Sequence, residues 1–399
     1  MMTKLLVIFL YFLPFIDLLT SIATWESKAS IGLILKGLFV IITSIYLFYK
    51  NYKKKEYWYL YGIFIIYFLL YGNYLVFNKP NTIFIEFINV IKIFYFPFLV
   101  LFFSQCENKE LSKKLFFYYS LCFLLMYLIP YPLGLGHNIN EIYENKNLYL
   151  SYFYVGNELV NIFVLVLPIG FLYLKDKKRI YLLGYLILIF LMILLLGTKT
   201  MYLGFVLVIG YFLLKKREKF KKYFCFVLIP IILILLLLPQ SSFYKNIKTS
   251  LEYYNIQKVS DLLTFQNIDN VIYSNRLSFV YNLHKNYQKE DISGKIFGMG
   301  RQKIMTMKDA EIDIFDIFYS IGILGLMIYL AFFAFVINKA KLKGIYAYLF
   351  WLLILISLFS GHVLLSPMTS SYLAIMVGIN YNEGKEKDEI LDQKSIKTT

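Results

Sequence analysis

The sequence predicts an all-α polytopic membrane protein, a bundle of about 12 transmembrane helices with one large extracytoplasmic loop. Hydrophobic residues make up 59% of the 399 residues and charged residues only 17%. The core of a soluble domain cannot hold so many apolar side chains. They lie in runs of about 15 to 22 residues, the length that a helix needs to cross about 30 Å of hydrocarbon, and lack the alternation of barrel strands.

The apolar runs give the order of the spans. We expect them at residues 5–23, 31–49, 57–77, 83–105, 115–134, 153–174, 180–197, 201–214, 223–238, 315–337, 345–360 and 363–380. The first run resembles the hydrophobic part of a signal peptide, with residues 21–23 as a loose cleavage site. It contains Pro14 and Asp17, however, and only Lys4 precedes it, so we expect an uncleaved span.

The basic residues set the expected topology. Twenty Lys and Arg residues lie in alternate loops, at 50–56, 106–114, 175–179, 215–222 and 338–344. The other short loops hold four, Lys28, Lys79, Lys146 and Lys199. Because positive loops stay in the cytoplasm, both termini should lie inside and the 239–314 loop outside. The expected organisation is therefore nine helices in 1–238, the loop 239–314, three helices in 315–381 and a cytoplasmic tail at 382–399.

The net charge of +16 does not indicate nucleic-acid binding, because the basic residues cluster between apolar runs rather than on one face. Cys106, Cys122 and Cys225 lie in or beside spans without a CxxC pair, so neither a disulfide framework nor a zinc site is indicated. No extracytoplasmic cluster of Asp, Glu and His has the close spacing of a metal-activated site. We therefore expect neither a cofactor nor a metal.

The segment 242–316 is the only long polar stretch of the chain. Ser274 is placed to cap a helix that runs to about Lys289, with Arg276 and Leu283 on nearly one face. A structured element would then hold the guanidinium of Arg276. The alternative is a surface arginine on a solvated helix.

Three glycine-containing turns accompany this segment. Residues 197–200 and 360–362 are expected to form tight turns of helical hairpins near the outer surface. Gly298-Met299-Gly300-Arg301 could form a turn whose backbone N–H groups cradle an anion, although a turn without a ligand is the plainer interpretation.

Ionisable residues within the spans or at their ends concentrate on the expected outer side. They are Asp17, Lys36, Glu86, Glu158, Lys199, Asp316 and His362, whereas Lys92 lies nearest the middle. The alternative for each is a structural partner, such as Lys36 for Glu86. Their shared side, covered by the one large loop, favours a polar site that opens outward.

The chain resembles the superfamily of O-antigen ligases and O-antigen (Wzy-type) polymerases, which are enzymes that assemble bacterial cell-surface polysaccharides. The resemblance rests on the order of short motifs. These are Pro14-Phe15-Ile16-Asp17, Gly156-Asn157-Glu158, Gly197-Thr198-Lys199-Thr200, Ser274-Asn275-Arg276, Ile296-Phe297-Gly298-Met299-Gly300, Glu311-Ile312-Asp313, Gly322-Ile323-Leu324-Gly325 and Gly361-His362.

The resemblance implies transfer of a glycan from an undecaprenyl-diphosphate donor to a second glycan at the outer leaflet, without metal or nucleotide. Arg276, with Arg301 and Lys199, would bind the diphosphate, since a guanidinium matches phosphate bidentately. Members often have arginine where this chain has Lys199, and ligases carry a loop histidine in a motif that His284 does not match. The candidates for the general base are Glu158, Glu311, Asp313, Asp316 and His362.

The sequence therefore leaves three candidate functions. The first is a polymerase in the bacterial cytoplasmic membrane, acting with a lipid-linked donor and a glycan acceptor, and with a flippase and a chain-length regulator as further partners. The second is a ligase that attaches finished glycan to another acceptor. The third is a flippase or other transporter, which typically has charges at the midplane and repeated halves; the sequence shows no repeat.

Overall fold

The computed structural model describes residues 2–26, 31–51, 53–78, 83–104, 111–138, 149–175, 177–215, 244, 248, 264–269, 273–359 and 361–379. Within these residues, eight helices are long and apolar enough to cross a membrane, and three shorter apolar helices accompany them. The all-α membrane fold is thus confirmed. The span expected at 223–238 and the tail at 382–399 lie outside the described residues, so the number of 12 stays a prediction.

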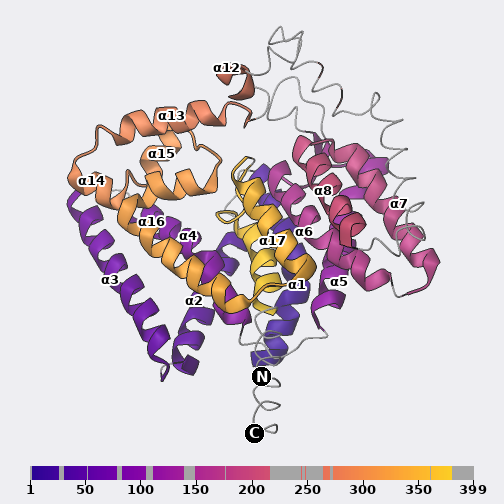
Figure 1. Cartoon of the computed structure of the whole chain (residues 1–399), viewed down its shortest axis with the longest axis horizontal. Helices are drawn as coiled ribbons and strands as arrows, with labels where there is room; N and C mark the ends of the chain where they lie inside the picture. The colour runs from indigo at the N-terminus through magenta and orange to yellow at the C-terminus, as the bar shows by residue number, and fades with distance from the viewer. Residues whose placement is uncertain are drawn as a thin grey trace. The chain divides into compact units, whose positions relative to one another are not determined.

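The labels of Figure 1 follow the chain. The apolar helices are α1 (Met2–Trp25), α2 (Ile31–Asn51), α3 (Lys55–Asn78), α4 (Ile83–Phe103), α5 (Leu111–Leu128), α6 (Gly156–Leu174), α7 (Arg179–Leu196), α8 (Lys199–Lys215), α16 (Asp313–Ala340), α17 (Gly344–Ser357) and an unlabelled Pro367–Ile379. Shorter elements are the 3₁₀ turn η2 (Tyr131–Leu133), β1 (His137–Asn138), β2 (Tyr149–Ser151), α12 (Phe265–Ile268), α13 (Arg276–Tyr287), α14 (Ile292–Phe297) and α15 (Arg301–Met307). β1 and β2 pair antiparallel, with His137 opposite Ser151.

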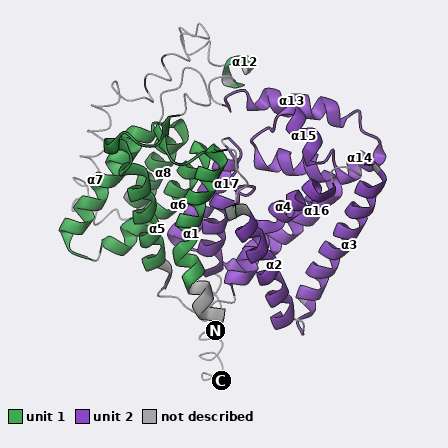
Figure 2. Cartoon of the chain, turned by 180° about the vertical axis from the view of Figure 1, so that it is seen from behind, with its two compact units in different colours: residues 1–33, 110–271 green, residues 34–109, 272–399 purple. Residues whose placement is uncertain are grey.

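The chain forms two compact units, coloured separately in Figure 2. Unit 1 comprises residues 1–33 and 110–271, and unit 2 comprises residues 34–109 and 272–399. Each unit therefore combines stretches that are far apart in the sequence.

Unit 1 shows how a proline inside a membrane helix is accommodated. Pro14 of α1 has no N–H, which leaves the carbonyl of Leu10 without its helical donor. The Tyr119 hydroxyl of α5 donates to that oxygen at 2.9 Å, and the neighbouring Tyr118 hydroxyl donates to Tyr11 O at 3.0 Å. These two bonds fix α1 against α5 while satisfying backbone groups that lipid could not.

The expected hairpin turn at 197–200 is confirmed in unit 1. Gly197 ends α7 in the left-handed conformation, with φ 53°, and its N–H donates to Ile193 O. Thr198 then accepts a bond from Met201 N at 3.3 Å and so caps α8. Lys199 is the first residue of α8.

In unit 2 the long helix α16 is broken at Gly322, which has φ 71° and ψ −174°. The break frees carbonyls of the preceding turn, and Tyr319 O and Ser320 O accept bonds from Met299 N at 2.8 Å and Gly300 N at 3.2 Å. A Cβ on Gly298 would overlap the Ser320 carbonyl, and one on Gly322 would overlap the Ile296 carbonyl. Glycine is therefore required on both sides of this contact.

The polar segment of unit 2 has a small core of its own. Leu283, Met299 and Ile304 are fully buried there, together with Tyr319 at the start of α16. In Figure 1 the helices α13, α14 and α15 lie beside one end of α3 and α16. The described residues 273–312 of the expected loop thus form a packed helical layer joined to membrane helices.

Candidate functional site

Arg276 is the first residue of α13 and is 7% exposed. Its Nη2 donates to Glu311 Oε2 at 2.7 Å, and its Nη1 donates to Tyr273 O at 3.2 Å and Phe359 O at 3.4 Å. Nε is buried without a hydrogen-bond partner among the described residues. A charged donor left unsatisfied in a protein interior is costly, so this guanidinium retains capacity for an anionic ligand.

The start of α13 differs from the expected cap. Asn275, not Ser274, occupies the N-cap position, and it makes no side-chain cap bond. Ser274 and Asn275 have φ values of 55° and 67°, whereas a capping residue normally has an extended backbone. The expectation for the helical face is confirmed, because Arg276 and Leu283 are both buried residues of α13.

Glu311 precedes α16 in an unfavourable backbone conformation, with φ 55°. A residue other than glycine in this region costs about 1 to 3 kcal/mol and persists only where its surroundings hold it. The ion pair with Arg276 is one such restraint. The Glu311 side chain is 33% exposed, so the pair lies at the edge of the buried cluster.

Asp313 and His362 form a carboxylate–imidazole pair. Oδ1 of Asp313 lies 3.2 Å from Nδ1 of His362, and Oδ2 accepts bonds from Val363 N at 2.9 Å and Leu364 N at 2.7 Å. Asp313 is 1% exposed, and both of its carboxylate oxygens are engaged by these contacts. With Nδ1–H donating to Asp313, Nε2 is the ring nitrogen that can accept a proton.

The surroundings of His362 act on its pKa in both directions. Burial lowers the pKa, but the hydrogen bond to Asp313 and the charges of Asp313 and Asp316 raise it, with Lys92 opposing them. The net result is a pKa above the usual 6.5. The imidazole is therefore a stronger base than free histidine.

Asp316 ties the approach to α16 to the helix itself. Its Oδ1 accepts a bond from Ala310 N at 2.9 Å and its Oδ2 one from Ile312 N at 3.2 Å. Oδ2 also lies 3.8 Å from Nδ1 of His362. The carboxylate thus shapes the turn that carries Glu311 and Asp313.

Arg301 is engaged by the polar segment itself. Its Nη1 and Nη2 bind the two carboxylate oxygens of Asp309, each at 2.7 Å. Its backbone N–H donates to Glu86 Oε2 at 2.6 Å, and Gln302 N donates to Glu86 Oε1 at 3.0 Å. Glu86, fully buried on α4, therefore caps α15 with its negative charge at the helix N-terminus.

The N–H groups of the turn at residues 298–301 are all engaged by other groups of the protein and are not free to bind an anionic ligand. Those of Met299 and Gly300 donate to carbonyls of α16, that of Arg301 donates to Glu86, and that of Gly298 donates to Gly294 O. The plainer interpretation of this glycine pattern is thus the one that the structure shows. The turn connects the polar segment to the broken helix.

Two candidates belong to unit 1. Glu158 lies in the first turn of α6, and Lys199 begins α8. The roles expected for these two residues stay predictions. His284, which the sequence left without a role, is exposed on α13 with its Nε2 2.9 Å from Gln288 Nε2.

Sequence reasoning missed Asp309 and the influence of Lys92 on His362. Asp309 lies eight residues after Arg301, beyond the helical spacing of three or four that would have suggested a pair. Lys92 lies on the buried helix α4, and its position in the middle of a span was the signal that could have marked it.

The fold and this cluster define a class, that of polytopic α-helical membrane proteins with a folded polar segment carrying a buried arginine and a carboxylate–imidazole pair. The chain belongs to the family of O-antigen ligase like membrane proteins, whose model it matches over residues 1–262 and 257–381. No curated protein and no solved structure matches it. The resemblance drawn from the sequence motifs is confirmed, and membership makes this a glycan-handling membrane protein with activity of the glycosyltransferase type.

Proposed function

We propose that this protein polymerises undecaprenyl-diphosphate-linked oligosaccharide repeat units into a cell-surface polysaccharide. It would act in the bacterial cytoplasmic membrane with both termini in the cytoplasm and the polar segment outside. The observation that carries the proposal is the buried cluster of unit 2. There Arg276 and the His362–Asp313 pair share two chain segments, since Glu311 precedes Asp313 by two residues and Phe359 precedes His362 by three.

Arg276 is suited to the leaving group. A polyprenyl diphosphate gains negative charge as the glycosidic bond breaks, and a positioned guanidinium stabilises that charge more in the transition state than before it. The two bonds from Nη1 to carbonyls are long, at 3.2 and 3.4 Å. A phosphate could replace them while Glu311 continues to hold Nη2.

His362 is suited to the acceptor. We assign it as the general base because its Nε2 is the proton-accepting nitrogen, whereas Asp313 and Asp316 accept backbone N–H bonds and act as positioning residues. The acceptor hydroxyl gives its proton to Nε2 and its oxygen bonds to the anomeric carbon. The bond from that carbon to the diphosphate breaks, and the diphosphate leaves with the electron pair.

The roles of the other candidates follow from their contacts. Arg301, bound by Asp309, and Glu86, bound by two N–H groups, hold α15 in place. Lys199 of unit 1 stays proposed for diphosphate binding, and Glu158 of unit 1 stays the alternative to His362 as the general base. A flippase and a chain-length regulator are proposed partners, and we propose that transfer requires no metal or other cofactor.

Purified protein in liposomes containing an undecaprenyl-diphosphate oligosaccharide tests the function. A polymerase yields a ladder of lipid-linked glycans and releases one undecaprenyl diphosphate for each bond formed. A ligase releases it only when a different acceptor is added, and a flippase moves the donor across the bilayer without release. Absence of release with every acceptor would refute glycosyl transfer.

A further inference from the structure

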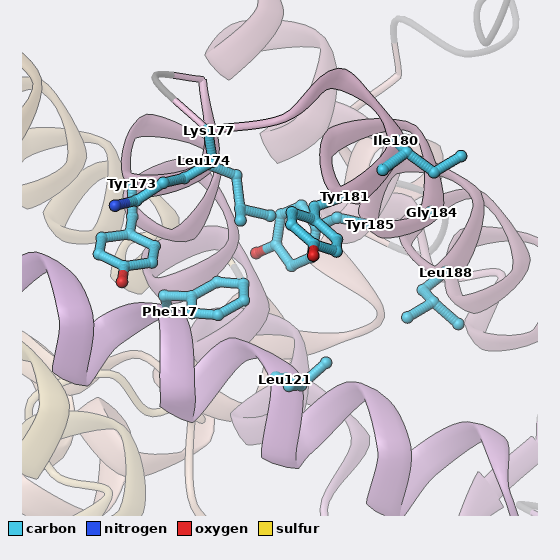
Figure 3. Close-up of a pocket in the computed structure, with 10 residues that line it drawn as sticks. All are labelled: Phe117, Leu121, Tyr173, Leu174, Lys177, Ile180, Tyr181, Gly184, Tyr185 and Leu188. Carbon is cyan, nitrogen blue, oxygen red and sulfur yellow. The ribbon is translucent and has the colours of Figure 1, made fainter.

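Unit 1 has an open groove of about 510 Å³ between α5, the end of α6 and the start of α7 (Figure 3). Phe117 and Leu121 line it from α5, Tyr173 from α6, and Tyr181 and Leu188 from α7. Its volume is within the range of about 300 to 1,000 Å³ typical of small-molecule sites. An apolar occupant fits such walls.

The aromatic wall is fixed by contacts that need no ligand. The rings of Phe117 and Tyr173 stack with centroids 5.0 Å apart, and Phe117 lies 5.9 Å from Tyr185. The Tyr185 hydroxyl donates to Leu167 O at 3.2 Å. Because these side chains already have their partners, a ligand would bind without first ordering them.

Gly184 keeps the groove open on α7. A Cβ built on this residue meets no atom within 4 Å. The same stretch of α7 exposes Ile180, Leu183 and Ile187, and α7 is one of the helices apolar enough to span the bilayer. The groove therefore opens toward the lipid-facing surface of this helix.

Basic residues stand at one end of the groove. Lys177 lines it, with Nζ 5.4 Å from the centroid of the Tyr173 ring. Lys178 and Arg179, both exposed, follow at the N-terminus of α7, where no side chain caps the helix. Cationic side chains and uncapped N–H groups at a helix N-terminus both attract phosphate.

We propose that this groove binds an anionic phospholipid of the bilayer. One acyl chain lies along the aromatic wall over Gly184, and the phosphate contacts Lys177, Lys178 and the N-terminus of α7. Charge complementarity identifies this occupant, because basic pockets between membrane helices favour anionic headgroups. The site differs from the cluster of unit 2 and does not depend on the proposed glycosyl transfer.

Binding of phosphatidylglycerol and of phosphatidylcholine with the same acyl chains to the purified full-length protein, measured by native mass spectrometry, tests the proposal. We expect the unmodified protein to retain phosphatidylglycerol selectively. Gly184→Leu fills the groove and should weaken this binding about tenfold or more, because displaced methylene groups lose their burial. Gly62→Leu is the matched control, since a Cβ on Gly62, also within a membrane helix, meets no atom within 4 Å.

A second pair of variants tests the headgroup. The double substitution Lys177→Gln and Lys178→Gln should weaken phosphatidylglycerol binding about 30-fold, at about 1 kcal/mol for each basic residue, and leave phosphatidylcholine unchanged. Lys341→Gln with Lys343→Gln removes two exposed charges from another turn before a helix and should have no such effect. The proposal is overturned if the unmodified protein binds the two lipids equally. It is also overturned if the control variants lose as much phosphatidylglycerol binding as the variants of the groove. If Gly184→Leu does not fold, the headgroup variants decide alone.

Discussion

Nδ1 of His362 lies 3.2 Å from Oδ1 of Asp313, so the turn before the last described helix and the first turn of α16 share one carboxylate–imidazole pair. The other oxygen of Asp313 holds the backbone N–H groups of Val363 and Leu364. The carboxylate thereby fixes both the ring and the chain that carries it. A base oriented in this way can receive a proton without reorganising.

The first prediction concerns pH. As the general base, His362 must be neutral, so the transfer rate should fall as pH falls through its pKa, which lies above 6.5. Asp313→Asn removes the charge that helps to raise this pKa, and the acid limb of the pH–rate profile should move to lower pH. His362→Ala should cost about 10²- to 10⁴-fold in rate. His284→Ala is the control, and an unmoved acid limb in Asp313→Asn would contradict the pairing.

The second prediction concerns Arg276. Arg276→Ala should lower the rate about 10²- to 10³-fold, roughly 2.7 to 4 kcal/mol, because the leaving diphosphate loses a preorganised donor. Arg276→Lys should not rescue fully, since lysine lacks the planar fork. Polymer length on gels from complemented cells with matched membrane expression measures the effect, and Lys285→Ala on the same helix is the control. Wild-type polymer from both variants would show that Arg276 does not bind the diphosphate and would leave Lys199 as the candidate.

The third prediction concerns the contact between the polar segment and α16. Gly298→Ala or Gly322→Ala should lower the free energy of unfolding by about 3 kcal/mol or more, because backbone strain and overlap with a carbonyl combine. Gly134→Ala separates these effects, since Gly134 has φ 66° but open space around it, and should cost about 1 kcal/mol. Thermal melting of the purified variants in detergent measures the order of their stabilities. Similar melting of all three variants would mean that the overlap is relieved by a small shift.

The fourth prediction is that transfer does not require a divalent metal. Among the described residues, no group of three or more His, Cys, Asp or Glu side chains is arranged to hold a metal ion, and the role of stabilising charge is assigned to Arg276. EDTA should leave the rate of purified enzyme unchanged. Loss of activity that manganese or magnesium restores would show this prediction to be wrong.

The fifth prediction concerns topology. The asymmetry of twenty to four basic residues between alternate loops places residue 260 outside and residue 395 inside. In a variant without native cysteines, Ser260→Cys should react with an impermeant thiol reagent in intact cells, and Ser395→Cys only after lysis. Reaction of both in intact cells would overturn the topology.

Much of the fold could be predicted because hydrophobic length is a local property of the sequence. The apolar runs expected at 57–77 and 180–197 correspond to α3 and α7 within a few residues. The break in α16 was not predicted. Gly322 lies in a continuous apolar run, and its conformation depends on the close approach of Gly298, which only the tertiary structure reveals.

The candidate site could be predicted in its residue types but not in its pairs. Arg276 was a candidate for diphosphate binding, and Glu311, Asp313 and His362 were candidates for the general base. The sequence could not show which carboxylate pairs with which basic side chain, because the partners are 35 to 49 residues apart and their pairing depends on the tertiary structure. For the same reason the sequence could not assign Arg301 to Asp309 instead of to a ligand.

The interleaved composition of unit 2 has a consequence for biogenesis. Glu86 is made 215 residues before Arg301, whose N–H it accepts, and Lys36 is made 331 residues before the Pro367 carbonyl to which it donates. At roughly 5 to 20 residues per second, about 10 to 40 s of synthesis separate Glu86 from its donor. During that interval the two charged residues are in the insertion machinery or the membrane without these partners. Unit 2 can therefore close only after the last helices have left the ribosome, and truncation of the C-terminal helices should expose early helices to quality-control proteases.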